Sequence, residues 1–322
     1  MSQISFSPFA NFNSAVAWGL WVSIYVWFVG ISAGAFLLIG IGRLRNDPCL
    51  KKIARPGLAL SLAALMAGLL SIQIDLGHIE RFYKLFLSPN PSSIMAWMVW
   101  LYSIYFVILA AMLVFSRKEM PRPLILFSVV FAFAVIAVES LLFAMPPGKA
   151  WHSPVFPLHF FTTSLVSAIA ALILVAGKIY SAGEKNDMLK GLARAAMPLV
   201  AINIAVGILE MVFSKSAGHL TSWVALLADV LVLALLAKSS SSLTVLAGLI
   251  GLVNVLFSKY ISLISAQVQE PFKGFARAYI EPRLGYSYSP TVFECLVSVA
   301  LVMLAIVLFY FLHNVSMAIR ED

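Results

Sequence analysis

Repeated apolar runs of about 17 to 25 residues constrain this chain more than any other feature, because each is about as long as one helical crossing of a bilayer. Such runs occur at residues 16–40, 56–76, 94–115, 123–144, 155–177, 195–213, 221–237, 242–264 and 291–312. With 61 % hydrophobic and 11 % charged residues, the chain has too little polar surface for a water-soluble globule of its size. We therefore predict an all-α integral membrane protein with about nine transmembrane helices.

The same composition excludes several other classes of protein. The runs are longer than the alternating strands of a membrane β-barrel, and no Lys or Arg precedes the first run, so we expect no cleaved secretory signal. The cysteines Cys49 and Cys295 lack the paired spacing of an iron–sulfur or zinc site. We expect no metal and no iron–sulfur cluster on this chain, and the net charge of +8 indicates membrane topology rather than nucleic-acid binding.

Basic residues gather in the first, third and fifth loops between the runs. They are Arg43, Arg45, Lys51, Lys52 and Arg55, then Arg117, Lys118 and Arg122, then Lys178, Lys185, Lys190 and Arg194. Loops rich in Lys and Arg stay in the cytoplasm. The prediction is a multi-pass protein of a bacterial or archaeal cytoplasmic membrane, with a periplasmic N-terminus and a cytoplasmic C-terminus.

Most ionisable residues within the runs lie, in this topology, near the periplasmic face. Asp75, Glu139, Glu210 and Lys259 are such residues, whereas Asp229 lies near mid-membrane. Charged groups are expensive inside a bilayer and are therefore candidates for function, although polar residues at helix ends also cap helices or extend to the headgroups. Carboxylates near a basic group are the proton donors and acceptors that two-proton, two-electron quinone chemistry needs.

Polar groups near mid-membrane in the second half of the chain allow two interpretations. Asn203, Asp229 and Asn254 lie on three successive predicted helices. Together with Glu210 and Lys259 they form a candidate proton path, and a buried interhelical hydrogen-bond cluster is the alternative. The outer loops at 77–93 and 265–290 are long and rich in aromatic and charged residues, so we interpret them as a docking surface for another subunit.

Three motifs resemble those of the NrfD/PsrC family, the membrane subunits of polysulfide reductase and of related respiratory complexes. The first helix has aromatic and small residues from Tyr25 to Gly34, a pattern that lets membrane helices approach closely. The second is the Asp-Leu-Gly-x-x-x-Arg-Phe segment from Asp75 to Phe82, with a Ser-x-Met helix start after Pro91. The third is Lys259, where many members have Arg, followed by Gln267.

The resemblance implies two tandem four-helix bundles, at residues 1–145 and 146–265, followed by a periplasmic loop and a ninth helix at 266–322. It implies that the chain exchanges electrons between menaquinone or ubiquinone and a periplasmic ferredoxin-like subunit with [4Fe–4S] clusters. A molybdopterin or multihaem subunit would then act on the terminal substrate, a compound of sulfur or nitrogen or a similar oxyanion. This chain would be the quinol-oxidising or quinone-reducing subunit and would not act alone on that substrate.

The quinone site expected from the resemblance lies in the first bundle. Tyr25 matches the position of a quinone-contacting His in the polysulfide reductase subunit, and bundle packing is its alternative role. Asp75 is the first choice for the proton-accepting group, with His78 one turn later and Arg81 within reach of its face, although Arg81 could equally anchor the helix at the interface. Gln267 completes the expected quinone contacts.

Glu139 is the second catalytic candidate. It lies in Val138-Glu139-Ser140, where the family has a Tyr-Thr-Gly stretch, so it either replaces that Tyr or belongs to a proton path.

Three other functions compete with quinone chemistry. A transmembrane haem needs two histidines in one membrane layer, and the histidines of this chain fall at or outside the boundaries of the runs. A secondary transporter places its site at the midplane between broken helices, which the runs do not show. A passive anchor for a periplasmic redox enzyme predicts that Asp75, Glu139 and Glu210 can be neutralised without loss of activity.

Overall fold

The computed structural model describes residues 16–76, 79–88, 90–115, 121–144, 152–214, 218–238, 240–268 and 288–318. Nine helices within these ranges are long and apolar enough to cross a membrane, which confirms the predicted number. They are α1 (Leu20–Leu44), α3 (Ala54–Asp75), α5 (Ile94–Val114), α6 (Arg122–Ala144), α7 (Phe156–Ile179), α8 (Ala182–Phe213), α9 (Leu220–Ala237), α10 (Ser241–Gln267) and α12 (Val292–Ala318). Shorter helical segments are α2 (Pro48–Lys52), the 3-10 helix η1 (Ile79–Arg81) and α4 (Lys84–Leu87).

The largest difference from the predicted runs is the start of α8. The apolar run begins at residue 195, whereas the helix begins at Ala182 and continues for 32 residues. At 1.5 Å per residue such a helix is about 48 Å long and exceeds the hydrocarbon core of a bilayer. Its polar first turns remain helical because a helix satisfies its own backbone hydrogen bonds in either solvent. Hydropathy detects only the apolar part.

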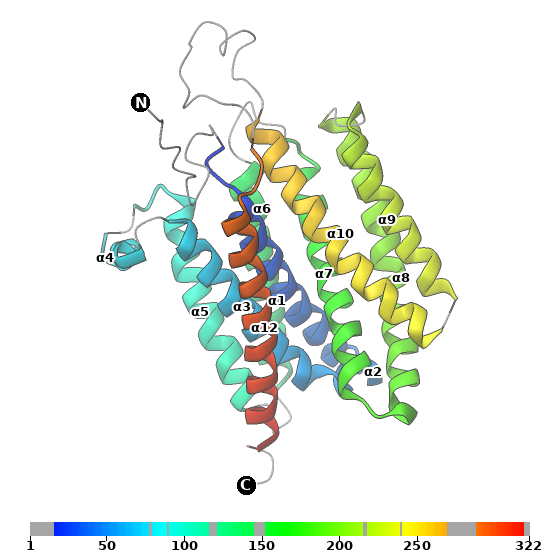
Figure 1. Cartoon of the computed structure of the whole chain (residues 1–322). Coiled ribbons are helices and arrows are strands. Elements are labelled where there is room, and N and C mark those ends of the chain that lie inside the picture. Colours follow the sequence, from blue (N-terminus) through cyan, green and yellow to red (C-terminus); the bar gives the residue numbers. More distant parts are fainter. Residues whose placement is uncertain are drawn as a thin grey trace, which may run out of the picture.

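Helix α1 occupies the centre of the molecule (Figure 1). It packs against α3, α6, α7, α10 and α12, and almost all of its residues are buried. Small residues allow the closest of these contacts. A Cβ added to Gly34 would lie 2.6 Å from the backbone oxygen of Ser164 on α7, so the two backbones nearly touch.

The other helices divide into two groups on either side of α1. Helices α3, α5 and α6 contact one another or α1, as do α7, α8, α9 and α10 on the other side, and α12 lies along α3. Helices α5 and α9 therefore stand at opposite sides of the molecule (Figure 1). Their outward faces expose apolar side chains such as Val107 and Leu227, which suits contact with lipid.

The start of α12 is tied to the start of α1. Thr291 and Glu294 form a capping box, in which the Thr291 backbone N–H donates to Glu294 Oε2 at 2.7 Å and the Glu294 N–H donates to Thr291 Oγ1 at 3.1 Å. The hydroxyl of Tyr288 donates to Glu294 Oε1 at 3.1 Å and accepts from the backbone N–H of Leu20 at 2.8 Å. These bonds fix α1 and α12 together at the end of the molecule where both begin.

Candidate functional site

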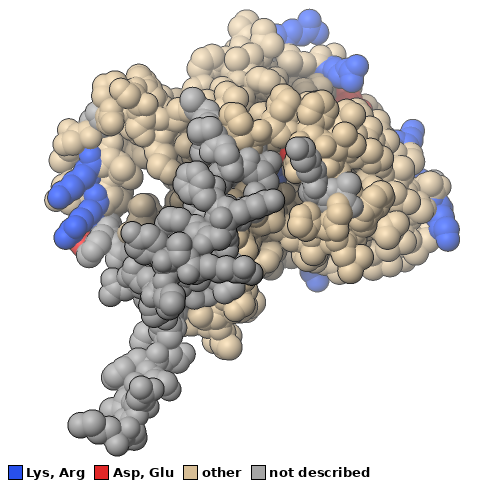
Figure 2. Space-filling view, turned by 90° about the horizontal axis from the view of Figure 1, so that it is seen from above, with Lys and Arg blue, Asp and Glu red and all other residues tan. Residues whose placement is uncertain are grey.

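A cavity of about 530 Å³ lies between α1, α3, α5 and α6 at the end of the molecule where α1 begins. The segment with η1 and α4 forms part of its wall, and the surface beside α4 is hollowed when viewed from this end (Figure 2). Most lining side chains are apolar or aromatic: Trp18, Val22, Leu69, Ile72, Leu76, Phe82, Leu85, Phe86, Met95, Met98, Val99, Phe106, Val107, Leu142 and Phe143. The polar lining residues are Tyr25, Gln73, Asp75, Tyr102 and Ser103.

Two tyrosines meet at the inner wall of this cavity. The hydroxyls of Tyr25 on α1 and Tyr102 on α5 are 2.7 Å apart and hydrogen-bonded, and both side chains are buried. Their rings stand edge to face at 6.2 Å. Sequence reasoning selected Tyr25 and missed Tyr102. The available signal was the pair Tyr102 and Tyr105, because tyrosines inside an apolar run bury a hydroxyl that needs a partner.

The other expected quinone contacts differ in whether they line the cavity. Asp75, the last residue of α3, lines it. Gln267 contributes indirectly, by holding Trp18. Its Nε2 donates to the Trp18 backbone oxygen at 2.9 Å, and its Oε1 accepts from the Trp18 backbone N–H at 3.0 Å. Arg81 is exposed, does not line the cavity, and has its Nε 3.7 Å from Glu80 Oε1. His78 lies outside the described residues.

Glu139 on α6 lies beside the tyrosine pair. Its side chain is fully buried, and neither carboxylate oxygen has a hydrogen-bond partner among the described residues. It interacts electrostatically with Tyr25, Tyr102 and Lys259. Lys259 on α10 is buried too, with Nζ 3.0 Å from the centre of the Phe160 ring and 3.2 Å from the Phe160 carbonyl oxygen, to which it donates. A buried carboxylate without hydrogen bonds is costly and therefore a functional candidate.

The polar residues of the second half form a compact cluster. Asp229 accepts one hydrogen bond from Asn203 Nδ2 and one from Asn254 Nδ2, both at 2.8 Å. Thr162 donates to Asn203 Oδ1 at 2.7 Å. These bonds join α7, α8, α9 and α10. The geometry of these residues is that of an interhelical hydrogen-bond cluster, the alternative to a proton path.

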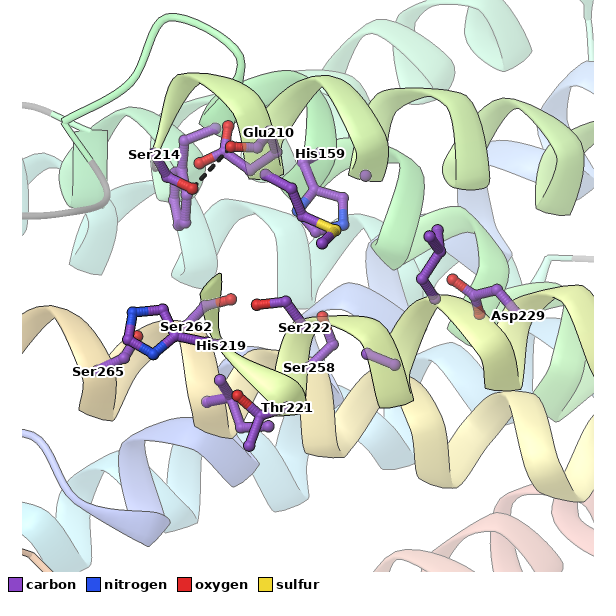
Figure 3. A pocket seen from close by; sticks show the side chains of 16 residues that line it. His159, Glu210, Ser214, His219, Thr221, Ser222, Asp229, Ser258, Ser262 and Ser265 are labelled. Carbon is purple, nitrogen blue, oxygen red and sulfur yellow. Dashed lines mark hydrogen bonds between the residues drawn. The ribbon is translucent and has the colours of Figure 1, made fainter. Parts of the chain in front are cut away.

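A second, polar cavity of about 110 Å³ lies among these four helices. Figure 3 shows its lining: Glu210 and His159 lie on one side, His219 and several serines on the other, and Asp229 at one end. Ser153 donates to Glu210 Oε2 at 2.9 Å. Among the described residues, no group of three or more His, Cys, Asp or Glu side chains is arranged to hold a metal ion.

Fold and cavity together define a class of protein: a multi-pass helical membrane protein with a mostly apolar cavity that is open to the surface and has two phenols and a carboxylate in its lining. Residues 9–271 match the family described as polysulphide reductase, NrfD. The chain therefore belongs to the NrfD family and is an integral membrane subunit of a multisubunit respiratory oxidoreductase.

Curated relatives agree with this membership. A selenate reductase subunit from Mesobacillus selenatarsenatis is 27 % identical, with 92 % of this chain and 85 % of the relative covered. An Hdr-like menaquinol oxidoreductase integral membrane subunit from Archaeoglobus fulgidus is 27 % identical over 50 % of this chain and 42 % of the relative. A polysulfide reductase subunit from Wolinella succinogenes is 26 % identical over 54 % of this chain and 62 % of the relative.

Among solved structures, the bd oxidase from Geobacillus thermodenitrificans has a similar fold. The TM-score is 0.62, the sequence identity 12 %, and the match covers 94 % of this chain and 96 % of that one. At this identity the likeness concerns the arrangement of helices alone.

Proposed function

We propose that this chain exchanges electrons between membrane quinone or quinol and a periplasmic iron–sulfur subunit. The observation that supports this most directly is the cavity between α1, α3, α5 and α6, with the hydrogen-bonded hydroxyls of Tyr25 and Tyr102 in its wall. Its volume lies in the range of about 300–1,000 Å³ typical of small-molecule sites. An apolar cavity with a few polar groups matches a molecule with a flat ring, two oxygens and a long hydrocarbon tail.

The residues of the cavity fit a quinone headgroup. Aromatic side chains such as Phe86 and Phe143 pack against flat rings, and a phenol can donate to a quinone carbonyl or accept from a quinol hydroxyl. A bound quinol supplies two electrons and two protons. In our proposal Tyr25 and Tyr102 orient the ring, Asp75 accepts a proton at the rim, and Gln267 keeps Trp18 in the wall.

Two further expected contacts enter the proposal with smaller roles. Arg81 is exposed beside Glu80, so we assign it to the membrane interface or to the docking surface rather than to the quinone. His78, outside the described residues, remains a proposed quinone contact.

The complex around this chain is proposed from the family and its relatives. A menaquinol oxidoreductase subunit and subunits of selenate and polysulfide reductases are among the similar proteins, so we propose menaquinol as the substrate, with ubiquinol as the alternative. A ferredoxin-like [4Fe–4S] subunit would receive the electrons and pass them to a molybdopterin or multihaem subunit. That subunit would reduce a sulfur, nitrogen or similar oxyanion compound.

The proposed topology places the cavity near the periplasmic face. The basic loops predict a periplasmic N-terminus and a cytoplasmic C-terminus, and we propose two four-helix bundles at 1–145 and 146–265 with the remaining helix at 266–322. Helix contacts on either side of α1 support this division. Asn203, Glu210, Asp229, Asn254 and Lys259 stay the proposed proton path of the second bundle.

Binding of a quinol analogue to the purified complex tests the proposal. Fluorescence quenching should show saturable binding in the wild type. Tyr25→Phe and Tyr102→Phe should each weaken binding by about tenfold, because each removes a hydrogen bond of about 1 kcal/mol or more from a buried site. The mutation Ser242→Ala, at the exposed far end of α10, is the control.

The opposite result supports a passive membrane anchor. In that case the wild type would show no saturable binding, and Asp75→Asn would leave the activity of the complex unchanged.

A further inference from the structure

The polar cavity of the second half and the proposed quinone cavity each share lining residues with a third, small cavity. A small cavity of about 10 Å³ lies between them, enough room for about one water molecule. Phe143 borders both this small cavity and the quinone cavity. On the other side, Phe156, His159, Ser258 and Ser262 line both the small cavity and the polar cavity.

Glu139 and Lys259 stand at this junction. Lys259 lines the small cavity. Glu139 interacts electrostatically with Lys259 on one side and with the hydroxyls of Tyr25 and Tyr102 on the other. The carboxylate itself lines neither cavity, but Tyr25 and Tyr102 line the quinone cavity and Lys259 lines the small one, and its own two oxygens are without hydrogen bonds among the described residues. Free lone pairs on a buried carboxylate suit it to receive a proton.

The polar cavity provides a way out for such a proton. It is large enough for several water molecules and has polar groups on all its helices, which is the condition for water to enter a cavity. His219 and Thr221 line it and are exposed. Because α9 begins at the same end of the molecule as α1 (Figure 1), the polar cavity opens at the same end as the quinone cavity.

We infer that one of the two quinol protons leaves sideways, through Glu139 and the polar cavity, to the same membrane face from which the quinone cavity opens. This inference rests on the proposed quinol oxidation. It differs from a path across the membrane, because the proton leaves at the face near which it is released and need not pass through the hydrogen bonds that join Asn203, Asp229 and Asn254.

The transfer balances in three steps. A quinol O–H bond breaks and its proton passes to a tyrosine hydroxyl, which gives its own proton to a Glu139 oxygen. The two electrons leave one after the other to the proposed partner subunit, whose several iron–sulfur clusters each take one electron, and the second proton leaves by Asp75. Glu139 then releases its proton to water in the small cavity, beside His159 and Ser262, and returns to a carboxylate. When it is protonated, Lys259 favours the ionised form of the Glu139 carboxyl between turnovers.

The experiment blocks the small and polar cavities with a chemical modification and leaves the quinone cavity unmodified. Ser262→Cys is made in the complex with Cys49→Ala and Cys295→Ala, and a small water-soluble methanethiosulfonate is added after purification. Ser262 lines the small and polar cavities and not the quinone cavity. Because the modification is added to folded protein and removed by a reductant, folding defects do not confuse the result. The control is Ser242→Cys on the same helix, exposed at its other end.

The expected result is reaction of Ser262→Cys with the reagent, a fall in kcat of at least about tenfold, unchanged analogue affinity, and recovery on reduction. Glu139→Gln should lower kcat by about 100-fold with affinity retained, because an amide cannot accept the proton. The inference is overturned if Ser262→Cys does not react, or if the modified protein or Glu139→Gln keeps the wild-type kcat. Failure of the wild type to bind the analogue would instead refute the proposed function.

Discussion

The contact between α1 and α7 gives a prediction whose size follows from the structure. A Cβ added to Gly34 would lie 2.6 Å from the carbonyl oxygen of Ser164 and 2.8 Å from Cβ of Ala168. Nonbonded heavy atoms pack best about 3.5–4.0 Å apart, so the helices would have to separate by about 1 Å. Neither opposing atom can rotate away, because one belongs to the backbone and the other is attached directly to it.

The predicted cost is the overpacking penalty less the gain in helix propensity. Overpacking a tight interior costs about 1–3 kcal/mol, here about 2–3 kcal/mol because neither opposing atom can move aside, and replacing Gly by Ala in a helix returns about 1 kcal/mol. We expect Gly34→Ala to destabilise the protein by about 1–2 kcal/mol and Gly34→Leu by more. Gly183→Ala is the matched control, since a Cβ there meets nothing within 4 Å and should be neutral or stabilising.

Gly30→Ala should have an effect on stability between those of Gly183→Ala and Gly34→Ala. Its added Cβ would lie 2.9 Å from Oγ of Ser164, the end of a side chain that can turn aside. Thermal unfolding in detergent, followed by tryptophan fluorescence, should rank the midpoints Gly183→Ala, Gly30→Ala and Gly34→Ala from highest to lowest. A Gly34→Ala midpoint equal to that of Gly183→Ala would refute the reasoning about the α1–α7 contact.

Three further predictions concern buried polar groups. Glu139→Gln should lower the free energy of unfolding by about 3 kcal/mol, because it removes the acidic partner of the buried Lys259; a thermal midpoint equal to that of the wild type would contradict this. Asn254→Ala should cost about 1–3 kcal/mol, because it takes one of two amide donors from Asp229, and a wild-type midpoint would argue against that bond. Burial raises the pKa of the Cys49 thiol to about 11, so in a Cys295→Ala background its alkylation should be slow at pH 8. The rate should rise about tenfold per pH unit as the thiolate forms, and a rate that levels off near pH 9 would be inconsistent with the burial.

Much of the fold could be predicted because bilayer thickness acts on local sequence. Each of the nine predicted runs lies on one of the nine spanning helices of the described ranges, since an apolar stretch of that length has no other stable state in lipid. The start of α8 at Ala182 could not be predicted in this way, because its polar first turns lie beyond the apolar run that hydropathy detects.

The candidate site was predictable in part. Tyr25 and Asp75 were selected from motifs, and both line the same cavity. Tyr102 was missed because the sequence of its apolar run does not indicate which face of the helix packs against α1. The neighbours of Glu139 come from α1, α5 and α10, three segments whose proximity no local pattern expresses.

By itself, the sequence determined that the chain crosses the membrane, how many times, and to which family it belongs. Only the tertiary structure decided which side chains meet, because helices that are apolar nearly all round are not oriented by hydrophobicity in lipid. Their rotation is set instead by close packing, as where Gly34 admits Ser164 and Ala168. That packing brings the hydroxyls of Tyr25 and Tyr102 together and buries the carboxylate of Glu139 among Tyr25, Tyr102 and Lys259.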